Sequence, residues 1–287
     1  AALLTANTQG LTNSGVLTAG ALSLNAPQVV NSGLIQGEKT LSLVATLLDN
    51  RSGGMIYTPS TLSLAVQDLK NAGIITSDAA LSLSGTQLTN SGELSGSVLD
   101  LNYGTLNNAT GGLLLAQGDN RMTAQSLSNA GTVAGERLTL YADELASSGL
   151  LQGESSLSLT AGMLNLLAGS RTLTSGTLSL SGTTFTTAGQ LQGQNVGLNA
   201  SDWHNRGSLL ATGNLSATLS GQLTSTGDIM SQGGTTLKAT GTDNQGNLLA
   251  AGDLSLSGNA LSNSGIVQGG TLTVNEDSIT NSGTLTG

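Results

Sequence analysis

Residues 11–24 read LTNSGVLTAGALSL, and this stretch returns with small changes along the whole chain. Its Asn-x-Gly triplet, here called the corner, begins at Asn13, Asn31, Asn71, Asn90, Asn129, Asn205, Asn244, Asn263 and Asn281. Degenerate corners contain Gly53, Gly111, Gly149, Gly169, Gly189 and Gly227. From Gly15 to Gly283 the fifteen corner glycines are spaced by about 19 residues, so the chain is an array of internal repeats.

A second element, Leu-Ser-Leu or a close variant, lies between successive corners, for example at residues 22–24, 41–43 and 157–159. Apolar, small polar, apolar is the alternation of a strand with one buried face. Further apolar residues precede and follow the corner, as Leu11 and Leu17 do in the first copy. Each repeat therefore predicts several short strands separated by glycine-containing corners.

The fold follows from what such a repeat can bury. A unit with short strands and no helix cannot cover its apolar face alone, whereas stacked units cover one another. We predict an all-β fold, a right-handed parallel β-helix (solenoid) of about 14–15 coils with roughly 19 residues per coil. Residues 1–287 are predicted to form a single array. Because the chain starts in mid-pattern at Leu3 and shows no polar capping repeat, we expect a fragment of a longer shaft without native caps.

Asparagine occupies the corner in eleven of the fifteen repeats. It tolerates left-handed backbone, and its side-chain amide both donates and accepts hydrogen bonds. Equivalent amides in successive coils can therefore bond to one another along the stack. We predict a structural ladder formed by Asn13, Asn31, Asn71, Asn90, Asn129, Asn205, Asn244, Asn263 and Asn281.

The other four corners replace asparagine by Ser147, Thr187, Ser225 and Leu167. Leucine has no polar group to continue a ladder, so the sequence predicts a local distortion between Met163 and Leu173. This distortion is interpreted either as a binding notch or as a bulged corner.

Composition excludes several classes of function. The 287-residue chain carries 8 Lys and Arg against 17 Asp and Glu, a net charge of −9, and only five aromatic residues. It lacks the cations and stacking rings that nucleic-acid binding needs. Without cysteine it can form neither a disulfide nor a thiolate metal site. No apolar run is long enough for a transmembrane helix, so we expect no membrane insertion.

Catalytic chemistry finds little support in the sequence. Polysaccharide hydrolysis needs two carboxylates roughly 5–10 Å apart, but the acidic residues are scattered and pair only at Asp143-Glu144 and Glu276-Asp277. Neighbours on a strand point to opposite faces, so neither pair makes a good dyad. A single histidine excludes a multi-histidine metal site. We predict no catalytic residue, no metal site and no cofactor, and keep a polysaccharide-degrading enzyme as the third hypothesis.

One segment is a candidate for ligand binding. Residues 202–206 read DWHNR, and Trp203 takes the apolar position before Asn205 where other repeats have leucine. Trp203 is interpreted either as a sugar-stacking residue with polar neighbours or as the filling of an enlarged core, with His204 pointing outward. Tyr57 is a further aromatic candidate. A face that binds a receptor or glycan around Trp203, His204 or Tyr57 is the second hypothesis.

The signature Leu-x-Asn-x-Gly-x-Leu/Ile-x-x-Gly-x-Leu-Ser-Leu resembles the haemagglutinin repeat of filamentous haemagglutinin-type exoproteins, which include adhesins and the effectors of contact-dependent growth inhibition. The likeness extends from Leu11 to Gly283. It implies a β-helical shaft that is secreted to the surface of a Gram-negative bacterium through an outer-membrane two-partner secretion transporter. The first hypothesis is therefore structural: the shaft projects a distal adhesive or toxin-delivering region toward a receptor or glycan on a target cell, bound through regions outside this segment.

Overall fold

The computed structural model describes residues 2–287 and divides the chain into two compact units, one ending at Ala142 and the other spanning Asp143–Gly287. Every regular element in the described residues is a β-strand, and no helix capable of crossing a membrane occurs among them. The boundary between the units falls within β14 (Thr132–Ser147). The fold is therefore all-β, as the alternating pattern predicts.

The first unit is built from thirteen strands that precede β14. They are β1 (Leu3–Asn7), β2 (Gly10–Asn13), β3 (Val16–Asn25), β4 (Gln28–Asn31), β5 (Leu34–Asn50), β6 (Met55–Thr58), β7 (Leu62–Asn71), β8 (Ile74–Ser77), β9 (Ala80–Asn90), β10 (Glu93–Gly96), β11 (Val98–Asn108), β12 (Leu113–Ala116) and β13 (Asp119–Asn129).

The second unit contains the strands that follow β14. They are β15 (Leu150–Leu166), β16 (Arg171–Thr174), β17 (Thr177–Thr187), β18 (Gln190–Gly193), β19 (Asn195–Ala200), β20 (Asp202–Asn205), β21 (Ser208–Ala211), β22 (Leu215–Leu219), β23 (Gln222–Ser225), β24 (Asp228–Ser231), β25 (Thr235–Lys238), β26 (Gly241–Asn244), β27 (Asn247–Ala250), β28 (Asp253–Asn263), β29 (Ile266–Gln268), β30 (Thr271–Asn281) and β31 (Thr284–Thr286).

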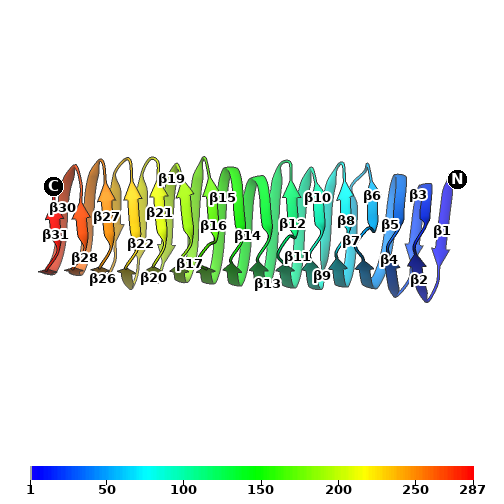
Figure 1. The fold of residues 1–287 in the computed structure, drawn as a ribbon, viewed down its shortest axis with the longest axis horizontal. Coiled ribbons are helices and arrows are strands. Elements are labelled where there is room, and N and C mark those ends of the chain that lie inside the picture. Colours follow the sequence, from blue (N-terminus) through cyan, green and yellow to red (C-terminus); the bar gives the residue numbers. More distant parts are fainter. Residues whose placement is uncertain (1) are drawn as a thin grey trace. The chain divides into compact units, whose positions relative to one another are not determined.

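Within each unit, strands pair in parallel with the equivalent strand one repeat later (Figure 1). Asn13 lies opposite Asn31 in the first unit, and Asn263 lies opposite Asn281 in the second. The prediction of a parallel β-solenoid with roughly 19 residues per coil is thus confirmed. The right-handed sense of the coils stays a prediction from the general preference of parallel crossovers.

Each coil has three short sides that bury alternate residues. In one coil, β4 leads into the corner, the first residues of β5 leave it, and Leu41-Ser42-Leu43 forms the third side. Val29, Ile35 and Leu43 point inward and are buried, while Ser42 is exposed. The interior is a set of stacked Leu, Ile and Val columns, because equivalent positions of successive coils lie in register.

The corner glycine is required by close approach between coils. A Cβ on Gly92 would lie 2.0 Å from the carbonyl oxygen of Gly73, and one on Gly246 would lie 2.1 Å from that of Gly227. Most corner glycines do not need a left-handed backbone, since positive φ occurs only at Gly53, Gly111 and Gly169 in residues 2–287. An absent side chain, and not an unusual φ, therefore lets the corners stack.

The three left-handed glycines mark corners that are two residues longer than the rest. The ladder position lies at Asn50, Asn108 and Leu166 in these corners, and the next ladder position follows 21 residues later in each case. In the ordinary coils shown by Asn13 and Asn71, that interval is 18 or 19 residues. The expanded corners recur every 58 residues (108 − 50 and 166 − 108), which is every third coil.

Candidate functional site

The corner asparagines of the first unit form a continuous column of amide hydrogen bonds. In each step Nδ2 of one asparagine donates to Oδ1 of the next, at 2.8–2.9 Å. The column runs through Asn13, Asn31, Asn50, Asn71, Asn90, Asn108 and Asn129, all of which are buried. It includes the expanded corners, so the amides stay in line although the chain around them lengthens.

Each amide also holds the backbone of the following coil. Nδ2 of Asn71 donates to the carbonyl oxygen of Glu93 at 2.9 Å as well as to Asn90. Asn244 bonds in the same way to the carbonyl of Ile266. No residue other than glycine has positive φ in residues 2–287, so the left-handed backbone that we expected asparagine to tolerate is not used. The amide hydrogen bonds account for asparagine at this position.

The column of the second unit is interrupted by leucine, but not at the predicted residue. Because this corner is expanded, Leu166 takes the ladder position and is buried, whereas Leu167 lies in the corner and is 48% exposed. The predicted distortion is an expanded corner around Gly169, with the same left-handed glycine as at Gly53 and Gly111. Loss of asparagine is therefore not its cause, since those two corners retain asparagine.

The column resumes at Thr187, one coil after Leu166, with a hydrogen bond from Trp203 of the next coil. The indole Nε1 of Trp203 donates to Oγ1 of Thr187 at 2.9 Å, and Thr187 Oγ1 donates to Oδ1 of Asn205 at 2.9 Å. Trp203 is fully buried and lies in register with Phe185 on one side and Leu223 on the other. The structure thus corrects the interpretation of Trp203 as a sugar-stacking surface residue, since the indole fills the core.

Beyond Asn205 the column changes chemistry a second time. Asn205 Nδ2 donates to the hydroxyl of Ser225 at 3.2 Å, and Ser225 turns its own proton to the carbonyl of Gly227 at 3.3 Å. Oδ1 of Asn244 consequently has no hydrogen-bond partner although it is buried. The amide bonds resume from Asn244 to Asn263 and from Asn263 to Asn281, at 2.8 Å each, and Asn281 is exposed.

The other two surface candidates lie in different units. His204 is half-buried on β20, next to Trp203, and lies in register with Thr186 and Thr224. Tyr57 is half-buried on β6, and its hydroxyl donates to Oδ2 of Asp78 at 2.8 Å. That hydrogen bond, with burial and the charge of Asp78, raises the pKa of the Tyr57 phenol. Trp203 and His204 are neighbours on β20 of the second unit, and Tyr57 belongs to the first unit.

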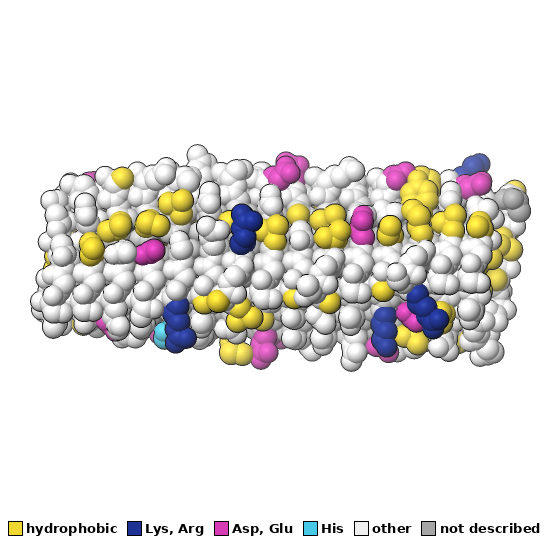
Figure 2. All heavy atoms as spheres, viewed as in Figure 1, with side chains coloured by type: hydrophobic (Ala, Val, Ile, Leu, Met, Phe, Trp, Pro, Cys, Tyr) yellow, Lys and Arg dark blue, Asp and Glu magenta, His cyan; other side chains and the backbone are white. Residues whose placement is uncertain are grey.

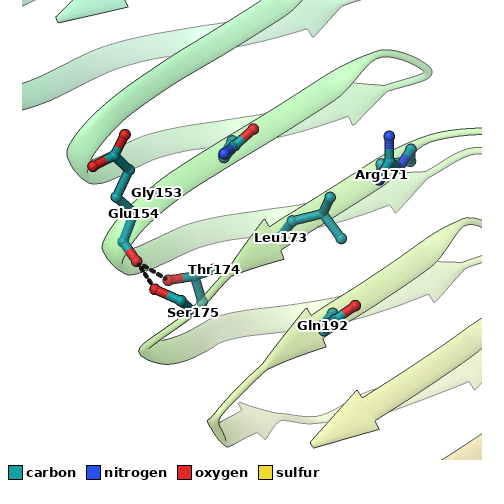
Figure 3. A pocket seen from close by; sticks show the side chains of 8 residues that line it. Gly153, Glu154, Arg171, Leu173, Thr174, Ser175 and Gln192 are labelled. Carbon is teal, nitrogen blue, oxygen red and sulfur yellow. Dashed lines mark hydrogen bonds between the residues drawn. The ribbon is translucent and has the colours of Figure 1, made fainter. Parts of the chain in front are cut away.

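A shallow hollow of about 510 Å³ lies over β15, β16 and β18 of the second unit (Figure 3). Arg171, Leu173 and Gln192 come from neighbouring strands along it, and Glu154 and Ser175 lie at the turn beyond. The hydroxyl of Ser175 donates to the backbone carbonyl of Glu154, not to its carboxylate. Glu154 is the one acidic residue among those that line this hollow, whereas glycoside hydrolysis needs a pair of carboxylates.

The two acidic pairs behave as solvated or structural groups. Asp143 and Glu144 are both exposed. Asp277 is exposed, whereas both carboxylate oxygens of Glu276 are buried without a hydrogen-bond partner, and burial raises the pKa of Glu276 above its usual 4.5. No group of three or more potential metal ligands occurs in the part of the chain that the structure describes. On the face seen in Figure 2, charged side chains are few and scattered over a mostly uncharged surface.

Comparison with known proteins places these repeats in a family. The haemagglutinin repeat family matches residues 133–229 and, in an overlapping copy, residues 210–286. The 16S rRNA endonuclease CdiA of Enterobacter cloacae subsp. cloacae is 63% identical over 284 residues, which cover 99% of this chain and 9% of that protein. The tRNA nuclease CdiA of Escherichia coli O6:K15:H31 is 44% identical over 304 residues, or 99% of this chain and 8% of that protein.

A more distant relative is the deoxyribonuclease CdiA of Dickeya dadantii, 34% identical over 137 residues, which cover 47% of this chain and 4% of that protein. No solved structure matches the chain significantly. The chain spans less than a tenth of the length of these relatives. Since the two family matches together cover residues 133–286, more than half of the 287 residues, the chain belongs to the haemagglutinin repeat family.

Proposed function

We propose that this chain is a segment of the shaft of a secreted, surface-displayed exoprotein of a Gram-negative bacterium, and that the shaft projects a toxin-delivering or adhesive region toward a target cell. The observation that carries this proposal is the in-register stacking of parallel coils in each unit, with the recurring leucine and asparagine side chains mostly turned inward. The amide column and the leucine columns both join one coil to the next.

The relatives support this role through their names and their length. Three CdiA proteins with different nuclease names share this repeat, although the chain covers less than a tenth of each. A segment shared by proteins that act on different nucleic acids fits a common carrier better than a catalytic part. We therefore assign the chemistry of such proteins to regions outside this chain, and assign no enzymatic activity to the chain itself.

Two partners belong to the proposal. The first is an outer-membrane two-partner secretion transporter, through which the chain passes before it folds. The absence of cysteine supports this route, because no disulfide can form in an oxidising periplasm and block passage. The second is a receptor or glycan on the target cell, bound through regions outside this segment.

The shaft proposal is tested by changing the number of coils in the full-length secreted protein. Residues 245–263 form one 19-residue repeat, since Asn244 lies opposite Asn263. Five extra copies should keep secretion and target-cell inhibition intact, and electron microscopy should show an extension of about 24 Å, from five spacings of about 4.8 Å. The matched control inserts the same length with residues 245–263 shuffled, which should stop secretion of folded protein.

The outcome that contradicts the proposal is specific. If the extended protein is secreted and folded but shows no added length, the coils do not act as a spacer. If it has the added length but the cell-surface protein loses contact with target cells, the segment recognises the target itself and is not a passive shaft.

A further inference from the structure

The second unit has a surface hollow of about 590 Å³ beside its stacked corners, and two arginines line it. Arg171 begins β16 and Arg206 lies in the corner two coils later. Both are exposed, and neither guanidinium takes part in an ion pair within residues 2–287. Arg171, Arg206 and Lys238 are the only cationic residues in the sequence of this unit, against nine Asp and Glu. Two of three cations therefore line one hollow in an acidic unit, unpaired.

The register places the two arginines on either side of one coil. Arg171 lies opposite Gln190, and Gln190 lies opposite Ser208, so Arg171 and Ser208 are two strand spacings, or about 10 Å, apart. Arg206 precedes Ser208 by two residues. The intervening coil contributes Gly189 and Gln190 to the lining of the hollow. A group held over Gly189 is thus within reach of both long side chains.

Gly189, in the floor of the hollow, packs closely against the preceding coil. A Cβ there would lie 2.1 Å from Oγ of Ser170 and 2.5 Å from its carbonyl oxygen. Ser170 itself lines the hollow, is 1% exposed, and its hydroxyl has no hydrogen-bond partner. The two other expanded corners have Gly54 and Gly112 at this position. The hollow thus combines two guanidiniums that take part in no ion pair with a floor that contains the backbone of Gly189.

One acid also lines the hollow, at its far end. Asp228 lies opposite Ser208, one spacing beyond it and three spacings from Arg171. Its Oδ1 accepts from Nδ2 of Asn247 at 2.7 Å. An anion placed over Gly189 is therefore nearer to both arginines than to this carboxylate.

We infer that this hollow binds a phosphate or sulfate group carried by a sugar. A guanidinium presents its donors in a planar fork that matches such oxyanions. Gln190 and Ser208 add uncharged polar groups that can pair with sugar hydroxyls. Nucleic acid fits poorly, because the hollow has only two cations and the aromatic residues nearest in sequence, Phe185 and Trp203, are fully buried. An acidic peptide fits poorly, because the lining residues include no large apolar side chain.

This inference does not depend on the shaft role, since a spacer can carry a binding site or lack one. The test is calorimetric titration of the 287-residue chain at low ionic strength with glucose 6-phosphate, inorganic phosphate and glucose as separate probes. We expect saturable binding of glucose 6-phosphate, weaker binding of inorganic phosphate, and none of glucose. Arg171→Gln and Arg206→Gln should each weaken binding about tenfold, as for loss of a charge-assisted hydrogen bond.

Two control variants sharpen the result. Lys238→Gln removes the remaining cation of the unit outside the hollow and should leave affinity unchanged. Asp228→Asn removes the opposing charge and should tighten binding. Unchanged melting temperatures show that these surface variants fold.

Several outcomes would overturn the inference. They are no saturable binding of glucose 6-phosphate, binding that survives both arginine substitutions, or an equal loss on Lys238→Gln. Equal affinity for inorganic phosphate and glucose 6-phosphate would reject the sugar. Tighter binding of a polyglutamate peptide would indicate a protein ligand in its place.

Discussion

The indole nitrogen of Trp203 donates to the hydroxyl of Thr187 at 2.9 Å, and through that hydroxyl it reaches the amide oxygen of Asn205. The bond connects a core aromatic to the polar column of the corners. It supplies to Thr187 a donor that Leu166, the preceding residue of the column, cannot supply. A tryptophan at this position therefore does more than fill volume, because it closes a gap in the hydrogen bonding.

Thr187→Val should destabilise the second unit. Valine keeps the shape of threonine but leaves the Trp203 N–H and Asn205 Oδ1 without their hydrogen-bond partner, which costs about 1–3 kcal/mol for each buried unsatisfied group. Denaturant unfolding followed by fluorescence of Trp203, the single tryptophan, measures the loss. Thr186→Val, at the outward-facing neighbour, is the control and should change stability by no more than about 0.5 kcal/mol. Equal effects of the two variants would argue against a role for the bond.

Asn108→Ala should be far more damaging than Asn107→Ala. Asn108 is fully buried, accepts from Asn90 and donates to Asn129, whereas Asn107 is exposed. We expect a loss of about 2–4 kcal/mol for Asn108 and a change within about 0.5 kcal/mol for Asn107, from circular dichroism during urea unfolding. Similar values for this adjacent pair would mean that the amide column contributes little.

Gly246→Ala should disrupt its corner although alanine is acceptable in an ordinary strand. The added methyl group would lie 2.1 Å from the carbonyl oxygen of Gly227, so the two coils must separate. Gly197→Ala is the matched control, because a Cβ at Gly197 meets no atom within 4 Å and its φ is not left-handed. The melting temperature should fall strongly for Gly246→Ala, and it should stay the same or rise slightly for Gly197→Ala.

Leu159→Asp should prevent stable folding of the second unit, whereas Ser158→Ala should be nearly neutral. Leu159 is fully buried in a leucine column that offers no partner for a carboxylate, and Ser158 lies on the outer face. Melting temperature distinguishes the two. A normal melt for Leu159→Asp would contradict the inward assignment, and a loss above about 2 kcal/mol for Ser158→Ala would contradict the outward one.

Glu276→Gln should stabilise the chain at neutral pH. The carboxylate folds over Gly258, its register partner, where both oxygens are buried without hydrogen bonds, and this burial raises the pKa of Glu276. A raised folded-state pKa means that stability is present below the unfolded pKa, near 4.5, and is lost as pH rises through the folded value. Melting curves of both proteins should therefore converge in acid and separate toward pH 7. A gap that stays constant with pH would point to packing instead of charge.

The period of the sequence predicts most of this fold. Residues spaced by about 19 share one environment, so the buried columns and the corner amides follow once the repeat is aligned. The exact occupant of one position is harder to predict, because it depends on neighbours in adjacent coils. Tyr103 is buried since its register partner, Gly85, leaves room for the ring. Trp203 is buried since the hydroxyl of Thr187 accepts a hydrogen bond from its indole N–H.

The misplacement of the ladder position at Leu167 has a related origin. Counting back from the corner glycine gives Leu166 or Leu167, and only the two extra residues of the expanded corner decide between them. The structure resolves the count, because Gly169 has the left-handed backbone of the expanded corners at Gly53 and Gly111. The hollow between Arg171 and Arg206 had no signal in the repeat, because it depends on departures from the repeat in two separate coils.

The expanded corners at Gly53 and Gly111 lengthen the chain by two residues, yet the amides of Asn50 and Asn108 remain bonded to both neighbours. The extra residues lie on the outside of the coil, and the column of amide hydrogen bonds continues without a break. A corner of this kind therefore accepts two added residues without a break in the hydrogen bonds between coils, which makes it the place where an insertion would disturb the stack least.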